Sequence, residues 1–208
     1  CLIDCVKSES KNQFRFLSAK KFYAPVLISP HLEGKDINVY VVSDRTKPFD
    51  AVVSICLMDF YGTRLKNVYL EVLVEPLKSK IYCSLSADTI KKFVRNSRDY
   101  FLLCRIREND KIISENILYP DKIKNLSLPE PEIRYAVEVL SGVLTLIMQS
   151  TALVKNMYLY TEEIEGFFSD NYFDLLPGEE KVITWTTSES LHLQDFKNAF
   201  RYIYINQN

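Results

Sequence analysis

Carboxylates gather in one short segment of the chain. They are Glu162, Glu163, Glu165, Asp170 and Asp174. A glycosidase needs two carboxylates held about 5–9.5 Å apart across a cleft, one of them with a raised pKa. The glutamates belong instead to a loop-like stretch in which charge is normally solvated, and Asp170 is a typical turn residue. We therefore assign no catalytic residue to this segment.

Nucleophilic and metal chemistry have little support. His31 and His192 lie far apart in the sequence, and neither accompanies a Ser or Cys in a nucleophile-like turn. The cysteines form no Cys-x-x-Cys pair, so we expect no metal and no cofactor. Those within strand-like segments are typical of buried thiols, with a chance disulfide between neighbouring strands as the alternative. The cysteines are Cys1, Cys5, Cys56, Cys83 and Cys104.

Aromatic side chains indicate a different chemistry, the binding of carbohydrate. Sugar rings present apolar C–H faces that pack on aromatic rings, and glycan-binding sandwiches display such rings beside polar groups. Half of the residues in a strand face inward, however, so the same rings are also explained as core, the single Trp above all. The proposed row consists of Tyr158, Tyr160, Tyr172 and Trp185, with Phe173 beside them.

The composition favours a β-rich chain and gives no sign of a strongly charged binding partner. Of 208 residues, 47% are hydrophobic, and 13 Tyr and 12 Phe favour strands. The 26 Lys and Arg nearly balance the 27 Asp and Glu, which argues against nucleic acid and anionic membranes as partners. No apolar run approaches the ~18 residues of a membrane span. The chain begins at Cys1 without Met, and we interpret it as a fragment of a longer protein.

Alternating apolar and polar residues predict short strands in the first half of the chain. Ile37, Val39 and Val41, for example, fall on one face of an extended segment. Residues 86–89 (SADT) contain capping residues ahead of a helical turn or two, and 108–110 is a hairpin turn. Turns at roughly ten-residue spacing predict a seven-stranded type of antiparallel sandwich. The predicted strands include 36–43, 51–60, 68–74, 80–85, 100–106 and 111–119.

The pattern stops and then restarts after a change of composition. Pro120, Pro129 and Pro131, among charged residues, are typical of a stiff linker over 120–131. We therefore predict an all-β chain of two tandem immunoglobulin-like sandwiches, at 23–119 and 132–208. The second contains predicted strands at 134–140, 142–149, 153–161, 167–176, 181–187 and 200–205, with a short capped helix or loop over 190–199. A short helix over 12–22 precedes the first.

A tight turn divides the clearest pair of predicted strands. Pro177 presets its own φ and Gly178 accepts a positive φ, so the chain can reverse there at little cost. Beyond the turn, Val182 and Thr184 alternate with Ile183 and Trp185, as in a strand. Two strands around a short corner are the building unit of a sandwich.

Three stretches together resemble β-mannosidases of glycoside hydrolase family two. Residues 19–26 (AKKFYAPV) resemble the junction between the catalytic barrel and the C-terminal sandwiches, which makes 1–22 a remnant of that junction. Ser114-Glu115-Asn116, followed by 126–129 (LSLP), looks like the exit from the first sandwich. Residues 168–179 (FSDNYFDLLPGE) are similar to the motif of the final immunoglobulin-like domain and are the most specific of the three.

The resemblance implies a non-catalytic region of a larger enzyme. The family removes terminal β-linked mannose with two glutamates on an upstream (β/α)₈ barrel, and no residue here matches them. The implied partner is therefore the barrel of the same parent chain, and a bacterial parent favours a periplasmic or extracellular location. A module that binds mannan-type glycans and an adhesion-type immunoglobulin-like module stay as alternatives.

Overall fold

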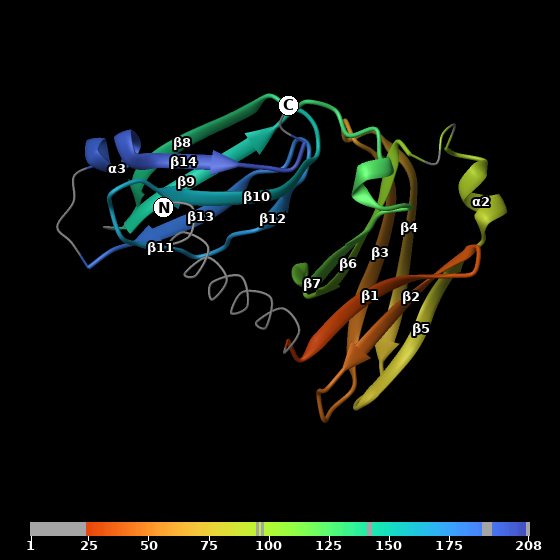
Figure 1. The fold of residues 1–208 in the computed structure, drawn as a ribbon. Coiled ribbons are helices and arrows are strands. Elements are labelled where there is room, and N and C mark those ends of the chain that lie inside the picture. Colours follow the sequence, from red (N-terminus) through yellow and green to blue (C-terminus); the bar gives the residue numbers. More distant parts are fainter. Residues whose placement is uncertain (1–23, 95, 97, 141–142, 189–192, 207–208) are drawn as a thin grey trace. The chain divides into compact units, whose positions relative to one another are not determined.

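A computed structural model describes residues 24–94, 96, 98–140, 143–188 and 193–206. The chain divides into two compact units, with the division between Ser127 and Leu128. Antiparallel sheets make up both units, so the all-β prediction is confirmed (Figure 1). The helix predicted over 12–22 and the junction assigned to 1–22 lie outside the described residues.

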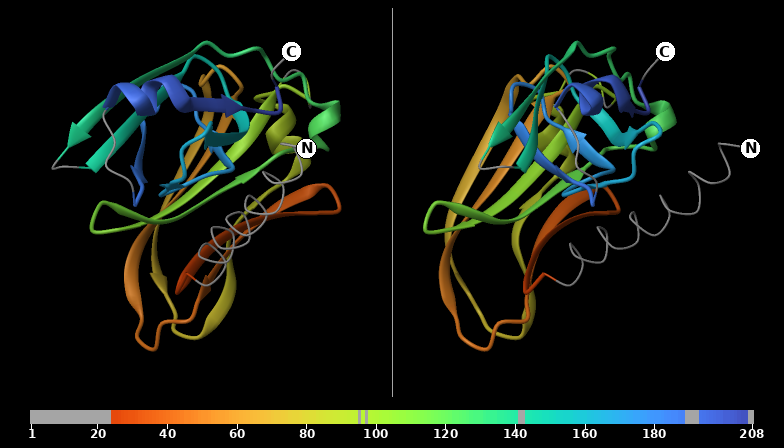
Figure 2. Two further views of the ribbon diagram at one scale, coloured as in Figure 1. Left: turned by 60° about the vertical axis from the view of Figure 1, so that its left-hand side comes forward. Right: turned by 90° about the vertical axis from the view of Figure 1, so that its left-hand side faces the viewer.

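The first unit is a sandwich of two sheets, seen as separate layers in Figure 2. Successive side chains of a strand point to opposite faces, so every second side chain points into the space between the sheets. Ile55 and Leu102 fill it from one sheet and Val39 from the other. One sheet has the order β1 (Val26–Glu33), β2 (Asp36–Ser43), β5 (Lys78–Leu85), and the other β4 (Arg64–Val74), β3 (Phe49–Asp59), β6 (Tyr100–Glu108), β7 (Lys111–Leu118).

Cys56, Cys83 and Cys104 of the first sandwich are not joined to one another by a disulfide. Cys104 is buried, and Cys56 and Cys83 are half-buried. Burial raises the pKa of the Cys104 thiol, because a thiolate would lose its hydration there. These side chains therefore act as small apolar groups, as predicted, and form no disulfide with one another.

Local sequence signals set the turns of this sandwich. Ser86 caps α2 (Ala87–Lys91) by accepting a hydrogen bond from the Thr89 N–H at 3.2 Å, as predicted. The predicted hairpin between β6 and β7 has Asn109 and Asp110 at positive φ, which short polar residues tolerate best. These residues specify where strands end.

Strand β1 was not predicted, because Pro30 interrupts its pattern. Pro30 is tolerated there because β1 lies at the edge of its sheet and pairs only with β2. Two side chains of β7 bind the Ile28 backbone: Ser114 Oγ accepts from its N–H at 3.0 Å, and Asn116 Nδ2 donates to its carbonyl at 3.2 Å. The Ser-Glu-Asn motif thus ties the edge strand of one sheet to the other sheet.

The second unit is a smaller sandwich around an aromatic core. Trp185 and Phe168 from one sheet meet Phe196 and Phe200, with ring centroids 4.8–6.4 Å apart. One sheet has the order β11 (Phe167–Phe168), β13 (Lys181–Thr186), β9 (Val143–Ser150), β8 (Ile133–Leu140), and the other β12 (Phe173–Leu175), β10 (Val154–Thr161), β14 (Phe200–Ile203), preceded by α3 (Leu193–Ala199). The helix alternative for 190–199 is confirmed for its described part.

The prediction of one strand over 167–176 was wrong. The segment forms two short strands, β11 and β12, which belong to different sheets. Between them Asn171 is buried and Tyr172 has φ 56°, so the chain leaves the extended conformation. The predicted Pro177-Gly178 turn follows β12, with Gly178 at φ 73° and the Glu179 N–H bonded to the Leu176 carbonyl at 3.3 Å.

Candidate functional site

The carboxylates singled out in the sequence hold the second sandwich together. Asp174 pairs with Lys155 through both oxygens, at 2.9 and 2.8 Å, and also accepts from the Asn156 N–H at 2.9 Å. Asp170 pairs with Lys181 at 2.6 Å. Glu162 pairs with Arg201 at 2.9 Å at the surface. These three of the five carboxylates are thus engaged by cations, which gives them a structural role.

The Asn171 side chain takes the place of a backbone hydrogen-bonding partner for Leu159 of β10. Its Oδ1 accepts from the Leu159 N–H and its Nδ2 donates to the Leu159 carbonyl, both at 2.8 Å. The side chain is 3% exposed, so both bonds lie away from water. A side-chain amide carries the same donor and acceptor as a peptide unit, which lets Asn171 pair with β10 where no strand continues.

The Trp185 ring lies in the core and offers no face to a ligand. Its side chain is 2% exposed and packs 4.8 Å from Phe196. Gly166 lies directly against the indole: a Cβ at this position would stand 2.3 Å from Trp185 Cζ2. Within the described residues the buried Nε1–H has no hydrogen-bond partner. A glycan-binding row in this sandwich therefore rests on the tyrosines.

Tyr158, Tyr160 and Tyr172 form one continuous stack. Tyr158 lies between the other two, with ring centroids 5.7 Å from Tyr160 and 4.8 Å from Tyr172, and interplanar angles of 16° and 25°. The rings are half-buried, on the face of β10 opposite buried Leu159. Tyr172 has a φ of 56°, and a positive φ is rare for a bulky residue. The sequence named all three tyrosines as candidates, and the structure brings them together.

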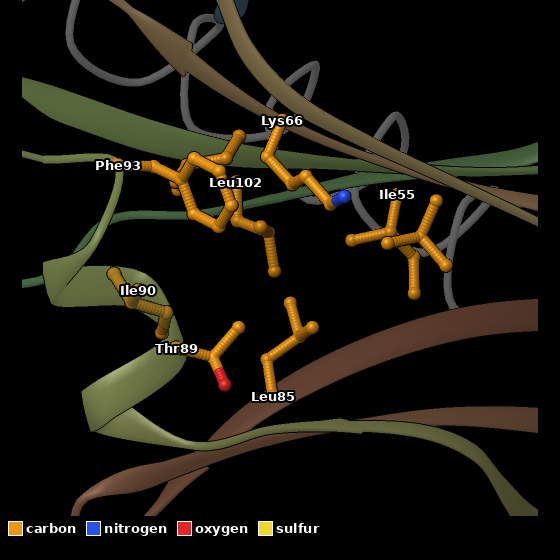
Figure 3. Close-up of a pocket in the computed structure, with 9 residues that line it drawn as sticks. Ile55, Lys66, Leu85, Thr89, Ile90, Phe93 and Leu102 are labelled. Atoms are coloured by element: carbon orange, nitrogen blue, oxygen red, sulfur yellow. The ribbon is translucent and has the colours of Figure 1, made fainter.

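An apolar cavity in the first sandwich is too small for a sugar. It lies beside α2, where Phe93, Leu85 and Ile90 face Ile55 and Leu102 (Figure 3). Its volume of about 10 Å³ is close to that of a single water site. We regard it as a packing defect between helix and sheet.

Neither a metal-ligand cluster nor a membrane-spanning helix occurs among the described residues. No group of three or more His, Cys, Asp or Glu side chains is arranged to hold a metal ion there. The helices described there are too short or too polar to span a bilayer. Neither finding adds a candidate site to the tyrosine stack.

Comparison with known families identifies both sandwiches. Residues 35–125 match the family described as a mannosidase Ig/CBM-like domain, and residues 128–207 match the Ig-fold domain of the mannosidase family. Both sandwiches are therefore mannosidase-type immunoglobulin-like domains. The predicted pair of tandem immunoglobulin-like sandwiches and the stated family resemblance are thereby confirmed.

Relatives of these β-mannosidase domains are much longer proteins. β-Mannosidase A of Aspergillus oryzae is 24% identical over 188 residues, which cover 82% of this chain and 20% of that protein. β-Mannosidase A of Aspergillus clavatus is 25% identical over 198 residues, covering 87% and 21%. The chain thus spans about one fifth of the curated relatives that it matches.

Solved structures share the fold of the β-mannosidase domains. The β-D-mannosidase from Dictyoglomus thermophilum matches with a TM-score of 0.76 and 15% identity, covering 92% of this chain and 23% of that one. The exo-chitosanase CsxA of Amycolatopsis orientalis matches with a TM-score of 0.57 and 14% identity, covering 91% and 26%. At such identities the likeness concerns architecture alone.

Proposed function

We propose that these domains are a non-catalytic accessory region of a β-mannosidase-like glycoside hydrolase. The parent would remove terminal β-linked mannose with a catalytic (β/α)₈ barrel in the same chain, and 120–131 would link the two sandwiches. The observation that carries this proposal is the use of the carboxylates: Asp170 and Asp174 are held by lysines within the second sandwich. The share of the relatives that the chain covers supports the same conclusion.

The accessory role is mechanical support of the barrel. Tyr69 and Leu73 of β4 lie on the outer face of their sheet and are 61% and 57% exposed. Strand register places Val52 of β3 beside Glu71, between those two residues, on the same face. Covering such side chains removes apolar surface from water at about 25 cal/mol per Å². We assign this face to contact with the rest of the parent chain.

The test compares the parent enzyme with surface variants. Tyr69→Ser with Leu73→Ser in the parent should speed thermal inactivation about fivefold, the effect of losing roughly 1 kcal/mol of contact. Leu32→Ser, at an exposed apolar side chain of β1, is the control and should leave the rate unchanged. The isolated domains should not hydrolyse 4-nitrophenyl β-mannoside. Equal inactivation rates for all variants, or turnover by the isolated domains, would contradict the proposal.

The tyrosine stack favours a second candidate, a glycan-binding module. Three half-buried tyrosines gather aromatic surface and hydroxyl groups in one row, and the strained Tyr172 backbone is the kind of feature that collects at binding sites. Mannan-type oligosaccharides are the ligands that the family suggests. The adhesion-type alternative has no specific observation in its favour.

Titration with β-1,4-mannohexaose, followed by NMR of the tyrosine ring protons, tests this candidate. Saturable chemical-shift changes of the Tyr158, Tyr160 and Tyr172 signals are expected, with a dissociation constant of ~1 mM. Tyr158→Ala should weaken binding about tenfold or more because it removes the middle ring. Tyr61→Ala, at an exposed ring in the first sandwich, is the control. Unchanged signals up to the solubility limit of the sugar would rule the candidate out.

A further inference from the structure

A polar network crosses the outer face of the β1-β2-β5 sheet. The Glu33 carboxylate accepts from Tyr40 Oη and from Asn38 Nδ2, each at 2.7 Å. Asn38 Oδ1 in turn accepts from Ser84 Oγ at 2.6 Å. The network therefore joins three strands through side chains alone.

Two rings border this network. The His31 ring meets Tyr40 edge to face, with centroids 5.6 Å apart and an interplanar angle of 85°. His31 is itself held by Ser29, whose Oγ lies 2.9 Å from Nε2. His31 and Glu33 are exposed and Tyr40 is half-exposed. A fixed aromatic surface thus lies beside fixed polar groups.

Strand register explains why these side chains share one face. His31 is opposite Asn38, and Asn38 is opposite Ser84, so the three form a row across the sheet. Tyr40 lies two residues along β2 and therefore points to the same side. The inward residues between them, such as Val39, fill the core. The sheet holds the row flat.

Hydrogen bonding favours one protonation state each for Glu33 and Tyr40. Bonds from Tyr40 and Asn38 lower the pKa of Glu33, so this group is an ionised acceptor at neutral pH. The bond to Glu33 raises the pKa of Tyr40, so its hydroxyl keeps its proton. Glu33 therefore acts as an acceptor and Tyr40 as a donor near neutral pH.

The chemistry of the row selects a ligand that both donates and accepts. A carboxylate oxygen can accept more than one hydrogen bond, and an amide nitrogen carries two N–H groups. The row thus offers acceptors at Glu33 and Ser84 and a donor at Asn38, which suits hydroxyl groups. The charge of Glu33 would repel an anion. The Asn38 N–H groups would face a cation unfavourably.

We propose that the outer face formed by His31, Glu33, Asn38, Tyr40 and Ser84 binds a neutral pyranose unit of an oligosaccharide. Vicinal hydroxyls bond Glu33 and Asn38, and the C–H face of the sugar packs on the Tyr40 ring, with the nearly perpendicular His31 ring beside it. The site belongs to the first sandwich and shares no residue with the tyrosine stack of the second. It is also independent of the accessory role proposed above.

Two conservative variants test the site in the complete chain. β-1,4-Mannohexaose and cellohexaose serve as probes, with binding followed by amide and ring NMR signals. The unmodified chain should show saturable shifts at His31, Asn38 and Tyr40. Glu33→Gln and Tyr40→Phe should each weaken binding about tenfold, as expected for losing a hydrogen bond that involves a charged group. Tyr82→Phe removes a hydroxyl from the same sheet outside the row, where it bonds the Leu73 carbonyl, and should bind normally.

Thermal unfolding separates binding from a purely structural network. If the network only holds the strands, the variants lower the melting temperature while no signal responds to sugar, which overturns the proposal. Shifts confined to Tyr158, Tyr160 and Tyr172 also overturn it and support the second sandwich instead. Shifts at both sets of residues, lost separately in Glu33→Gln and Tyr158→Ala, would establish two sites.

Discussion

Replacing Asn171 by leucine should unfold the second sandwich at a much lower urea concentration. Leucine has a similar size but leaves the Leu159 N–H and carbonyl, both bonded at 2.8 Å in the native chain, without partners. Each unsatisfied buried group costs about 1–3 kcal/mol, so we expect a loss of roughly 2–6 kcal/mol of unfolding free energy. Urea denaturation followed by Trp185 fluorescence measures it, because the chain's single Trp lies in this core.

Asn198→Ala is the matched control for this prediction. Asn198 is an exposed residue of α3 in the same sandwich and accepts a side-chain bond from Gln194 at 3.0 Å. Removing a solvated bond of this kind should change stability by less than about 0.5 kcal/mol. If Asn171→Leu proved as mild as this control, the pairing of Asn171 with β10 would carry little stability and the assignment would fall.

Gly166→Ala should also destabilise the second sandwich strongly, although it adds one methyl group. The new Cβ would stand 2.3 Å from Trp185 Cζ2 and 2.6 Å from Nε1, far inside van der Waals contact. The indole cannot move away freely, because it is 2% exposed and packs against Phe196. Overpacking of this kind costs about 1–3 kcal/mol and occasionally more. Thermal unfolding followed by circular dichroism measures the loss.

A double-mutant cycle tests the cause of that loss. Trp185→Phe removes the indole edge that Gly166 touches, so Gly166→Ala should cost less in that background than in the native one. Glu165→Ala, an exposed neighbour, is the control and should stay within about 0.5 kcal/mol of the native chain. Equal costs of Gly166→Ala in both backgrounds would show that the backbone, rather than the ring contact, is responsible.

Several elements followed from sequence pattern because their causes are local. Strand β2 spans Asp36–Ser43, the predicted range, since apolar residues alternate there without interruption. The Ser86 cap, the Asn109-Asp110 hairpin and the Pro177-Gly178 turn depend on the conformations and hydrogen bonds that these residue types favour. The strand pattern over 167–176 was misleading, because local β propensity cannot show that β11 and β12 join different sheets.

The candidate sites depended on contacts between distant residues. The sequence proposed Tyr158, Tyr160, Tyr172 and Trp185 as one row, yet only packing decided that the three tyrosines stack and that Trp185 lies inside. The row around Glu33 was missed because β1 was not predicted and Ser84 lies 46 residues from Asn38 in the chain.

Local sequence features were enough to establish the β class, the turns and the kinship with β-mannosidase domains, because period-2 alternation, turn residues and short motifs are local patterns. Which side chains meet depends on the tertiary structure. Register across strands brings His31, Asn38 and Ser84 into one row, and a register shift of one residue would send each strand's side chains to the opposite face. No local pattern specifies that register, because it is set jointly by the core, the turns and the partner strands.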